Sequence, residues 1–463
     1  MIHAKEPLSR HALLGLVAMG VAVLVVANDF TALSVALPAM EKEFGADLTT
    51  VQWVINGYAL IFGVLIVTGG RLADMFGRRK VFFLGAAIFS LFSLLGGLAP
   101  SIGVLLVSRG AMGIGGALMW PAILGMTYTL LPASRAGLAG GLILGAAGLG
   151  NSVGPLLGGT LTDTLGWRWI FYVNLPVAAF AVLVTLKVVA RDEPSAQGKR
   201  IDYSGIAALS VGLFALLLAL DEGATRGWLA PLIIALFITS AVALVIFVLV
   251  ESRAGNDALI PRDVLDNRVF VAACLTTLLM SAIFFAALLY LPQFMTKQLG
   301  YSALRSGAGL LPMMGTFALV SFIAGAVYER LGAKIVVSGG AALLAAGMYL
   351  LSSIHASSHY SDMVPGMIVL GMGVGVFYSS ITTAAVTALD KARASLAGGL
   401  VYMFQIAGGS IGLGVNTAIV FTAPSLVDGI NRAFFVDSIL AICGLMISAL
   451  FIGEQSRRAN PAP

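Results

Sequence analysis

Long apolar runs are the feature of this sequence that most constrains its fold. A helix that crosses a bilayer needs about 20 mainly apolar residues, and about fourteen such runs follow one another along the 463 residues. They cover, approximately, residues 11–38, 48–70, 81–98, 102–124, 136–161, 169–189, 204–220, 228–250, 269–291, 304–328, 333–353, 363–389, 395–421 and 432–452. The sequence therefore predicts an all-α polytopic membrane protein with about 14 transmembrane helices.

The composition excludes a soluble protein of this length. Hydrophobic residues make up 59% of the chain and charged residues only 11%, whereas soluble domains carry about 25% charged residues. The 55 glycines are typical of closely packed membrane helices. The two cysteines, Cys274 and Cys443, lie inside apolar runs, so we expect no disulfide framework. The first apolar run is too long for a cleaved signal peptide and is interrupted by Asp29.

The basic residues gather in alternate connections between the predicted spans. If the N-terminus is cytoplasmic, most lysines and arginines lie on the cytoplasmic side, as the positive-inside rule requires. We therefore expect a multi-pass protein of the cell's inner (cytoplasmic) membrane with both termini cytoplasmic. The net charge of +5 is then a topology signal and does not indicate nucleic-acid binding. The cytoplasmic set is Lys5, Arg10, Arg71, Arg78, Arg79, Lys80, Arg135, Lys187, Arg191, Lys199, Arg200, Arg253, Arg262, Arg268, Arg330, Lys334, Lys391, Arg393, Arg457 and Arg458.

Two sequence patterns recur at nearly equal offsets. GRLADMFGRRK at 70–80 is echoed by GAVYERLGAK at 325–334, at an offset of 255. RAGLAGGL at 135–142 is echoed by RASLAGGL at 393–400, at an offset of 258. The repeats indicate a duplication of six-span halves, a common construction of alternating-access transporters. The predicted division is 1–191 for the N-terminal half, 192–268 for two inserted transmembrane helices with cytoplasmic joints, and 269–463 for the C-terminal half.

At these motifs the sequence resembles the major facilitator superfamily, and within it the fourteen-span drug:proton antiporters that export multiple drugs, quaternary ammonium compounds or tetracycline. The residues at 70–80 are similar to the superfamily's loop signature, SRGAMGIG at 108–115 to its fourth-span arginine motif, and GLGNSVGPLLGG at 148–159 to its fifth-span antiporter motif. DFTALSVALP at 29–38 and WRWIFYVNLP at 167–176 resemble motifs of the fourteen-span branch. The resemblance covers essentially the whole chain. It implies two six-helix halves with two inserted helices, and it names no substrate.

Asp29 is the one acidic residue that the predicted spans place deep in the membrane, and Arg109 lies at a similar depth in the fourth span. A charge at the centre of a membrane helix costs about 2.5–3.5 kcal/mol even on lenient scales, so it usually lines a polar cavity or exchanges protons. We predict that Asp29 carries the proton and attracts cations, and that Arg109 is coupled to it in a shared cavity. The alternatives are a structural Asp29 that bonds neighbouring backbone and an Arg109 that extends to the outer interface.

The loop signature is the candidate conformational latch. A carboxylate flanked by glycines, such as Asp74, can sit against a helix N-terminus and neighbouring arginines, although positive-inside anchoring accounts for part of the charge. The resemblance implies that this loop holds the halves together on the cytoplasmic side and breaks as the protein opens inward. Its residues are Gly70, Asp74, Gly77, Arg78 and Arg79. Since only Glu329, Gly332 and Lys334 survive in the second half, we expect a weaker latch there.

The glycines of the fifth predicted span recur every four residues, which presents one smooth face for close helix contact. The antiporter motif comprises Gly150, Gly154, Pro155, Gly158 and Gly159. Because the proline removes a helical hydrogen bond, the motif predicts a hinge or a seal between the halves, with plain packing as the alternative. No lysine and hydroxyl pair follows, so the motif is not a phosphate-binding loop.

Polar, aromatic and methionine side chains within the spans are candidates for substrate contact. As a set they suit an amphipathic cation, because aromatic faces attract cations and methionines adapt their shape. The candidates are Asn28, Asp29, Gln52, Asn56, Tyr58, Met112, Trp120, Tyr290, Tyr378, Tyr402, Gln405 and Asn416. His355, His359 and Asp362 have a spacing that can bind metal, but they lie in a short serine-rich loop, and we expect no metal site.

The sequence predicts a secondary active transporter: a proton-coupled antiporter that exports small amphipathic drugs or toxic compounds. Because we place no deep carboxylate in the second half, monocations are preferred over dications. The alternative on the same fold is export of a neutral or anionic metabolite, lipid or antibiotic. A membrane enzyme or a sensor is a distant alternative, since no convergent catalytic constellation is present. We expect no cofactor beyond the proton gradient, no nucleic acid, and a functional monomer in the lipid bilayer.

Overall fold

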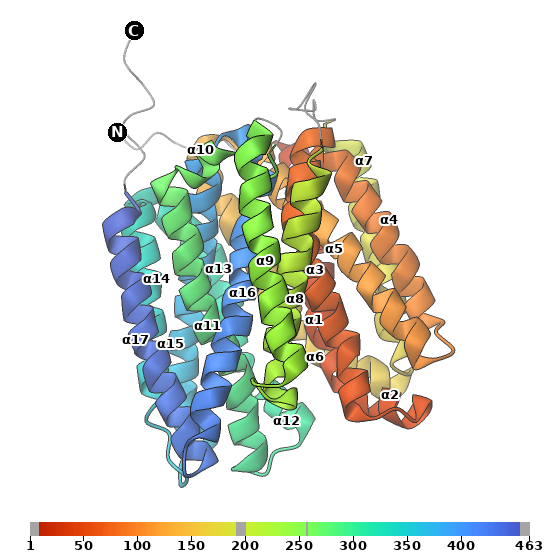
Figure 1. The fold of residues 1–463 in the computed structure, drawn as a ribbon. Helices are drawn as coiled ribbons and strands as arrows, with labels where there is room; N and C mark the ends of the chain where they lie inside the picture. Colours follow the sequence, from red (N-terminus) through yellow and green to blue (C-terminus); the bar gives the residue numbers. More distant parts are fainter. Residues whose placement is uncertain (1–8, 191–200, 256–257, 454–463) are drawn as a thin grey trace.

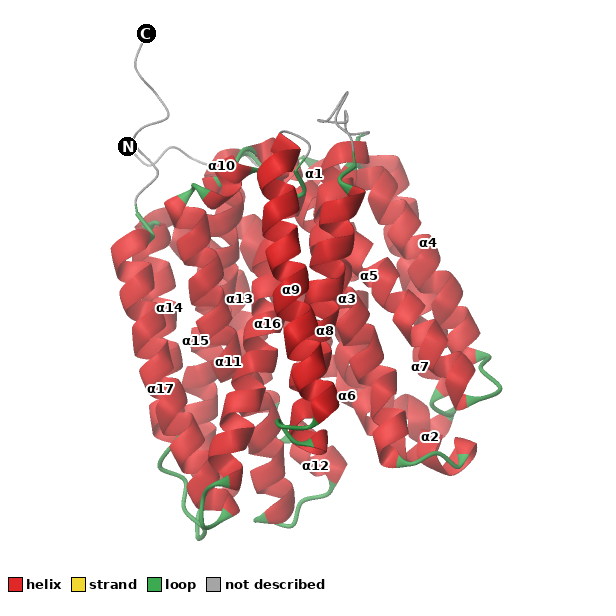
Figure 2. Cartoon of the chain, in the orientation of Figure 1, coloured by secondary structure: helices red, strands yellow, loops and turns green. Residues whose placement is uncertain are grey.

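The computed structural model describes residues 9–190, 201–255 and 258–453. Within these residues the chain is helical and contains no strand (Figure 2). Fourteen of the described helices are long and apolar enough to cross a membrane. The predicted fold class and span number are therefore confirmed. The seventh predicted span, the shortest in the sequence, is a full helix that extends from Tyr203 to Arg226.

The helices before the inserted pair form one continuous series. The first crossing ends in a 3₁₀ turn and a short helix, and each later crossing is a single long helix. In chain order they are α1 (Arg10–Ala32), η1 (Leu33–Val35), α2 (Leu37–Phe44), α3 (Leu48–Phe76), α4 (Arg78–Gly97), α5 (Ile102–Leu130), η2 (Ala133–Arg135), α6 (Ala136–Thr164) and α7 (Arg168–Val188).

The remaining helices comprise the inserted pair and a second series of crossings. In chain order they are α8 (Tyr203–Arg226), α9 (Pro231–Ala254), α10 (Arg262–Leu265), α11 (Arg268–Lys297), α12 (Ala303–Ala308), α13 (Leu311–Leu331), α14 (Ala333–Leu351), α15 (Tyr360–Ala388), η4 (Lys391–Arg393), α16 (Ala394–Phe421) and α17 (Leu426–Phe451). The predicted spans match these helices. The largest differences are at the ends of α1, α3, α5, α8 and α11 and at the starts of α13 and α17.

The signature predicted as a loop is mostly helical. Residues 70–76 form the last two turns of α3, and α4 begins at Arg78, so Gly77 alone separates the two helices. Its φ of 99° lies in the region that glycine adopts without strain. Gly332, with a φ of 82°, separates α13 from α14 in the same way. Placing the motif on helices fixes the direction of its side chains, which a loop would not.

The long helices form two groups that meet along two seams. In the first group, α3 and α4 pack on α5, and α1 packs on α6 and α7. In the second group, α13 and α14 pack on α15, and α11 packs on α16 and α17. Between the groups α6 packs on α13 and α3 packs on α16 (Figure 1). The division at 1–191, 192–268 and 269–463 remains a prediction.

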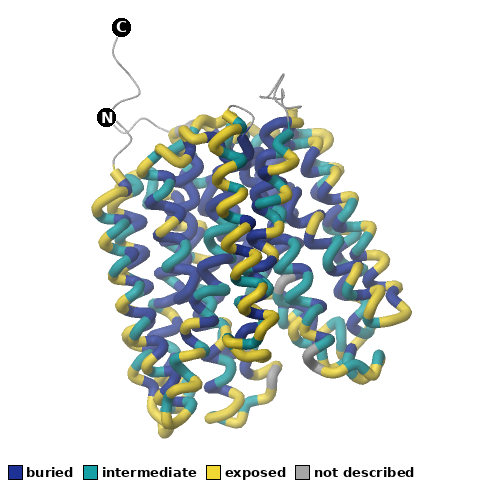
Figure 3. The backbone as a smooth tube through the Cα atoms, in the orientation of Figure 1, coloured by how far each residue is buried: buried dark blue, intermediate teal, exposed yellow. Residues whose placement is uncertain are grey.

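The inserted helices lie across one of these seams. α8 contacts both α3 and α16, and α9 packs against α8 in front of it (Figure 1). Exposed residues follow the outside of the bundle, and buried residues lie where the helices pack together (Figure 3). Many of the exposed side chains are large and apolar, as a lipid-facing surface requires.

Basic residues mark one end of the bundle, the end at which α1 begins and α17 ends. We call it the basic end, and it is the upper end in Figure 1. It carries Arg10, Arg71, Arg78, Arg79, Lys80, Arg135, Lys187, Arg253, Arg262, Arg268, Arg330, Lys334, Lys391 and Arg393. The other members of the predicted set, Lys5, Arg191, Lys199, Arg200, Arg457 and Arg458, lie outside the described residues. We call the opposite end the far end.

Candidate functional site

Asp29 and Arg109 form a buried ion pair inside the first helix group. Asp29 lies near the end of α1 and Arg109 two turns into α5, and Arg109 Nη1 donates to Asp29 Oδ2. Both side chains are 0% exposed. The two residues predicted to share a cavity are thus in direct contact, and the packed interior of the helix group encloses them. The charge of each is compensated where neither reaches water.

Neighbouring helices complete this ion pair. Arg109 Nε donates to the Val54 carbonyl of α3 at 2.6 Å. Asn174 of α7 donates to Asp29 Oδ1 at 3.2 Å and contacts Ser93 Oγ of α4 at 3.2 Å. The network therefore joins five helices through one ion pair. Asn174 lies within the WRWIFYVNLP motif, but its residue type alone did not distinguish it from other buried amides.

Aromatic rings surround the Arg109 guanidinium. Its Cζ lies 4.4 Å from the centroid of the Tyr58 ring and 5.9 Å from that of Phe171. Arg109 Nη1 also contacts Met112 Sδ at 3.7 Å. The predicted substrate candidates Tyr58 and Met112 thus support the ion pair directly. Cation–π contact adds about 2 kcal/mol where the cation is desolvated.

The beginning of the WRWIFYVNLP motif ties α2 to α7 at the far end. Trp167 Nε1 donates to Glu43 Oε2 at 2.7 Å, and Arg168 Nη1 donates to Glu43 Oε1 at 2.5 Å. Partial burial raises the pKa of Glu43, but the hydrogen bonds from Trp167 and Arg168 and the charge of Arg168 outweigh it, so this pKa lies below its ordinary value. Glu43 is therefore held as a charged carboxylate at neutral pH.

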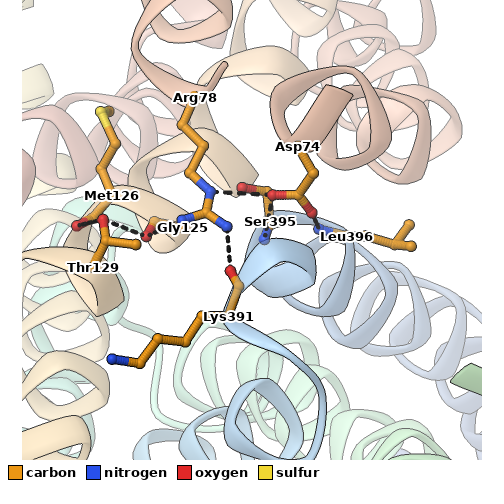
Figure 4. A network of polar contacts seen from close by, with 8 residues as sticks. All are labelled: Asp74, Arg78, Gly125, Met126, Thr129, Lys391, Ser395 and Leu396. Carbon is orange, nitrogen blue, oxygen red and sulfur yellow. Dashed lines mark hydrogen bonds and ion pairs between the residues drawn. The ribbon is translucent and has the colours of Figure 1, made fainter. Parts of the chain in front are cut away.

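The carboxylate of Asp74 bridges the two helix groups at the basic end. It accepts hydrogen bonds from the backbone N–H groups of Ser395 at 3.3 Å and Leu396 at 2.8 Å (Figure 4). Both donors belong to the first turn of α16, where N–H groups lack helical partners and the helix dipole favours an anion. Gly70 permits this approach, because a Cβ there would lie 2.6 Å from the Ser395 carbonyl oxygen.

Arg78 holds Asp74 in place and crosses between the groups itself. Its Nε donates to Asp74 Oδ1 at 3.1 Å, and its Nη1 donates to the Gly125 carbonyl at 3.2 Å (Figure 4). Its Nη2 donates to the Lys391 carbonyl at 2.5 Å, in the turn before α16. Asp74 and Arg78 therefore form one polar cluster, which we call the basic-end latch.

A second contact lies at the equivalent position of the repeat. Glu329 of α13 accepts from the Leu138 N–H at 3.2 Å, in the first turn of α6. Glu329 lies 255 residues after Asp74, and Leu396 lies 258 residues after Leu138, the offsets of the two sequence repeats. Next to it, Gly137 and Gly325 bring the backbones of α6 and α13 together. The repeat thus places an acid against a helix N-terminus twice.

The described hydrogen bonds of Arg79, a predicted latch residue, lie within its own helix group. Its Nη1 and Nη2 donate to the carbonyls of Val189 at 2.6 Å and Leu186 at 3.0 Å, at the end of α7 in its own helix group. Basic side chains near helix C-termini complement the last carbonyls and the dipole. The described hydrogen bonds of Arg79 thus fasten α4 to α7, while Arg78 makes the bonds that cross.

The antiporter-motif glycines pack against α1 within their own helix group. A Cβ at Gly150 would meet the Leu24 carbonyl, one at Gly154 would overlap Thr31, and one at Gly158 would overlap the Ala32 carbonyl. Pro155 lies inside α6 among them. A Cβ at Gly159 would have more room, because its nearest neighbours would be Leu304 Cδ1 at 3.5 Å and Val35 Cγ1 at 3.6 Å. These glycines therefore form a close-contact face, but the seam with the other group is made by Gly137, Gly141 and Gly148 of the same helix, which face α13.

Aromatic candidates from both groups meet at the centre of the bundle. The ring centroids of Trp120 of α5 and Tyr402 of α16 lie 4.6 Å apart, and Phe62 of α3 lies 5.5 Å from Tyr402. Trp120, Tyr402 and Gln405 line a small cavity together with Leu144. The structure thus brings three predicted substrate candidates into one place, on helices that belong to different groups.

A second cavity, of about 90 Å³, lies where the inserted helix α8 meets α3 and α16. Asn56 Nδ2 donates to both oxygens of Asp221, at 3.1 and 3.0 Å. Ser410 and Leu217 complete the wall. Asp221 is exposed and forms no ion pair among the described residues, so it is a carboxylate that a cation can reach. The predicted end of the seventh span, at residue 220, left it outside the membrane.

The other residues predicted to contact substrate lie apart from the central cavity. Gln52 is exposed on α3, and Asn28 is buried beside Asp29 with no hydrogen-bond partner for its Oδ1 among the described residues. The Tyr378 hydroxyl pairs with Ser281 at 2.9 Å. Tyr290 pairs with Thr417 at 2.8 Å. None of these side chains lines the central cavity.

The second half does contain a deep carboxylate, contrary to our prediction. Asp437 is the twelfth residue of α17, which spans 26 residues, and it is 0% exposed. Asn416 of α16, a predicted substrate candidate, donates to Asp437 Oδ1 at 3.1 Å and to the Gly412 carbonyl at 2.9 Å. The predicted span began at residue 432, which placed Asp437 near the surface. The predicted preference for monocations over dications rested on the absence of such a carboxylate, so it no longer has support.

The histidines form a capped turn. His359 is the N-cap of α15 in a reciprocal capping box with Asp362, whose Oδ2 accepts from the His359 N–H at 2.7 Å. The His355 N–H donates to Ser358 Oγ at 2.9 Å. No cluster of three metal-ligating side chains occurs in the described part of the chain.

Comparison with known proteins relates the chain to one family. The family model described as Major Facilitator Superfamily matches residues 19–413 and, in a second match, 273–462. The puromycin resistance protein of Streptomyces alboniger is 35% identical over 91% of this chain and 85% of its own. A multidrug resistance protein of Mycobacterium tuberculosis is 34% identical over 88% and 76%, and the lincomycin resistance protein of Streptomyces lincolnensis is 31% identical over 98% and 94%.

A solved structure has the same fold at low sequence identity. The human organic anion transporter MFSD10 superposes with a TM-score of 0.68 and 15% identity, over 94% of this chain and 99% of its own. The arrangement of the two helix groups is therefore one already seen in a transporter.

Proposed function

This chain belongs to the Major Facilitator Superfamily and is a multi-pass membrane transporter rather than an enzyme, and from this premise we propose that it exports small amphipathic drugs or toxic compounds in exchange for protons. The names of three relatives, which refer to resistance to puromycin, to lincomycin and to multiple drugs, support drug efflux. Transport proceeds by alternating access, in which the two helix groups rock around a central site.

The orientation of the proposed exporter follows from the basic end. Lysines and arginines in short connections mark the cytoplasmic side of bacterial inner-membrane proteins. The basic end is thus cytoplasmic, with both termini on that side, and the far end is external. The basic-end latch and the Glu329 contact then close the cytoplasmic side in this conformation. The exporter acts as a monomer in the bilayer, and the proton gradient is its energy source, with no cofactor.

The buried ion pair is the observation that carries proton coupling. Arg109 compensates the Asp29 charge in a place closed to water. When Asp29 takes up a proton, the ion pair loses its attraction and leaves Arg109 as an uncompensated buried charge, which is costly by about 3–5 kcal/mol. Such a cost favours rearrangement of the five helices that the network joins. Protonation is thereby tied to a change of conformation.

The carboxylate best placed to attract a cationic substrate is Asp221. Asp29 is occupied by Arg109, whereas Asp221 lines an open cavity between α3, α8 and α16 and has Asn56 as its hydrogen-bond donor. The central aromatic cluster of Phe62, Trp120 and Tyr402 supplies faces that bind cations. We therefore assign amphipathic cations as substrates without a preference for one charge over two, and give the inserted helix α8 a place in their recognition.

Efflux from intact cells tests this function. Cells that express the chain are loaded with fluorescent compounds matched in size and differing in charge, and efflux is followed with and without a protonophore. We expect faster efflux of the cations, abolished by the protonophore and weakened by Asp221→Asn. Asp428→Asn, which changes an exposed acid at the start of α17, is the matched control. Efflux that survives collapse of the proton gradient contradicts antiport, and selective efflux of neutral or anionic compounds supports the alternative substrate class.

A further inference from the structure

Asp437 is a buried carboxylate that the proposed coupling at Asp29 does not use. It lies about 16 Å along α17 from the helix start, at 1.5 Å per residue, so it stands near the middle of the membrane. Among the described residues its only hydrogen-bond donor is Asn416, to Oδ1, while its Oδ2 has no partner there. Asp29, in contrast, is paired with Arg109 and Asn174.

The described surroundings of Asp437 hold no compensating cation. The helices packed against α17 are α11, α14 and α16. Their titratable side chain that faces Asp437 is Tyr290 of α11, which pairs with Thr417, the residue after Asn416. Within the ranges that the structure describes, no lysine, arginine or histidine forms an ion pair with Asp437. An ionised carboxylate without a partner is strongly disfavoured in such a place, so the group neutralises itself with a proton.

The hydrogen bonds of the Asp437 and Asn416 pair agree with a proton on Asp437. Oδ2 of Asp437 and Oδ1 of Asn416 are both buried acceptors without a donor in the described part of the chain. Two unsatisfied acceptors in one buried pair are unfavourable, because each has lost its hydrogen bonds to water. A proton on Oδ2 removes the charge and turns one of these acceptors into a donor.

One helix connects this pair to the basic-end latch. The first turn of α16 is held by Asp74, and Asn416 lies 20 residues after Leu396 on the same uninterrupted helix. When the latch opens, α16 moves against its neighbours, and Asn416 moves with it. The hydrogen-bond donor that Asp437 has in this conformation is therefore carried by the element that the transport cycle displaces.

We propose that Asp437 is a second proton-binding site, occupied while the basic end is closed and emptied when α16 moves, so that the exporter exchanges two protons for each substrate molecule. This inference rests on the proposed proton antiport and adds its stoichiometry. It assigns one exchanging carboxylate to each helix group: Asp29, whose charge is compensated by Arg109 in this conformation, and Asp437, which is neutral in it.

Electrogenicity measures the stoichiometry directly. Proteoliposomes are loaded with a monovalent quaternary ammonium dye at equal pH on both sides, and a potassium diffusion potential makes the lumen negative. Exchange of two protons for one such cation moves net positive charge inward, so the potential expels the dye against its own electrical force. We expect this expulsion from the wild type, its loss in Asp437→Asn with pH-driven exchange retained, and its recovery in Asp437→Glu. Asp428→Asn serves as the control and behaves as the wild type does.

The outcomes separate this inference from the proposed function. If the wild type exchanges dye for protons under a pH gradient but does not respond to the potential, it exchanges one proton for each dye molecule. This result overturns the second proton-binding site and leaves the proposed antiport standing. The second site is also overturned if Asp437→Asn responds to the potential as the wild type does, because a permanently protonated structural acid would behave so. A wild type without any pH-driven exchange overturns both proposals. If Asp437→Asn fails to fold, the wild-type response to the potential still decides.

Discussion

Arg109 is a fully buried cation, and its charge is balanced by Asp29 on another helix. Removing one partner of such a pair leaves an unmatched charge, whereas removing both leaves two neutral groups of similar shape. The two residues therefore form an energetic unit, and their contribution to stability differs from the sum of the single changes.

A double-mutant cycle tests this unit. We expect Asp29→Asn to lower the free energy of unfolding by about 3–5 kcal/mol and Arg109→Gln to act in the same direction, since each leaves the other charge unpaired. The double variant recovers most of the loss. Thermal unfolding in detergent measures the stability of the wild type, both single variants and the double variant. Additive losses would show that the pair is not coupled.

The sequence predicted this pair but missed two other buried polar residues, Asn174 and Asp437. Asp29 and Arg109 stood out because charges are rare in apolar spans. Asn174 was hidden because buried amides are common, and only its contact with Asp29 reveals its role. Asp437 was hidden because the polar residues at 428–432 resemble a loop, although the helix starts at Leu426 behind the N-cap Ser425. Side-chain partners from distant helices are not encoded in local sequence patterns.

At the scale of helices, α1 and α6 are held at backbone contact by glycines. Gly158 faces the Ala32 carbonyl of α1, while the next residue, Gly159, faces only the tips of side chains. The two positions therefore form a matched pair for the same substitution on the same helix.

We predict that Gly158→Ala forces α6 away from α1 and lowers the free energy of unfolding by about 1–3 kcal/mol or more. Gly159→Ala changes it by less than about 1 kcal/mol, because ordinary contact distances remain and alanine favours the helix. Melting temperature and the monodisperse fraction on size exclusion report the difference. Equal effects at both positions would contradict the close-contact face.

Helix number and order were predictable because each crossing needs a long apolar run, and fourteen were found. Helix boundaries were less predictable than helix number where polar residues continue a helix beyond the apolar run. The residues from Gly70 to Phe76 extend α3 because their charged side chains lie at its basic end, where Asp74 and Arg78 find partners in α16 and its preceding turn. The direction of Arg79, toward α7, could not be predicted from the motif.

The whole molecule is closed at its basic end by two contacts. Asp74 accepts from two backbone N–H groups and from Arg78, and Glu329 accepts from the Leu138 N–H. Hydrogen bonds to charged groups contribute about 1.5–3 kcal/mol each. The sequence prediction of a weaker latch at Glu329 stays a prediction.

We expect Asp74→Asn to open the basic end more often than Glu329→Gln does. A cysteine introduced as Val386→Cys reports opening, because Val386 is buried and lines a cavity of about 130 Å³ between the two helix groups at that end. Alkylation of this cysteine should be fastest in Asp74→Asn, intermediate in Glu329→Gln and slowest in the otherwise unchanged chain. Background from the native Cys274 and Cys443 is measured without Val386→Cys. Equal rates in the two variants would show that the contacts are equivalent.

Reconstitution in vesicles tests whether the Asp29 and Arg109 pair couples drug transport to proton movement. Purified protein is reconstituted in vesicles with an acid lumen, and a quaternary ammonium dye, which cannot cross as a neutral base, is added outside together with a lumenal pH indicator. We predict dye uptake accompanied by alkalinisation of the lumen, with both lost in Asp29→Asn although dye binding remains. Uptake that proceeds without proton movement, or that is unchanged in Asp29→Asn, would contradict the account.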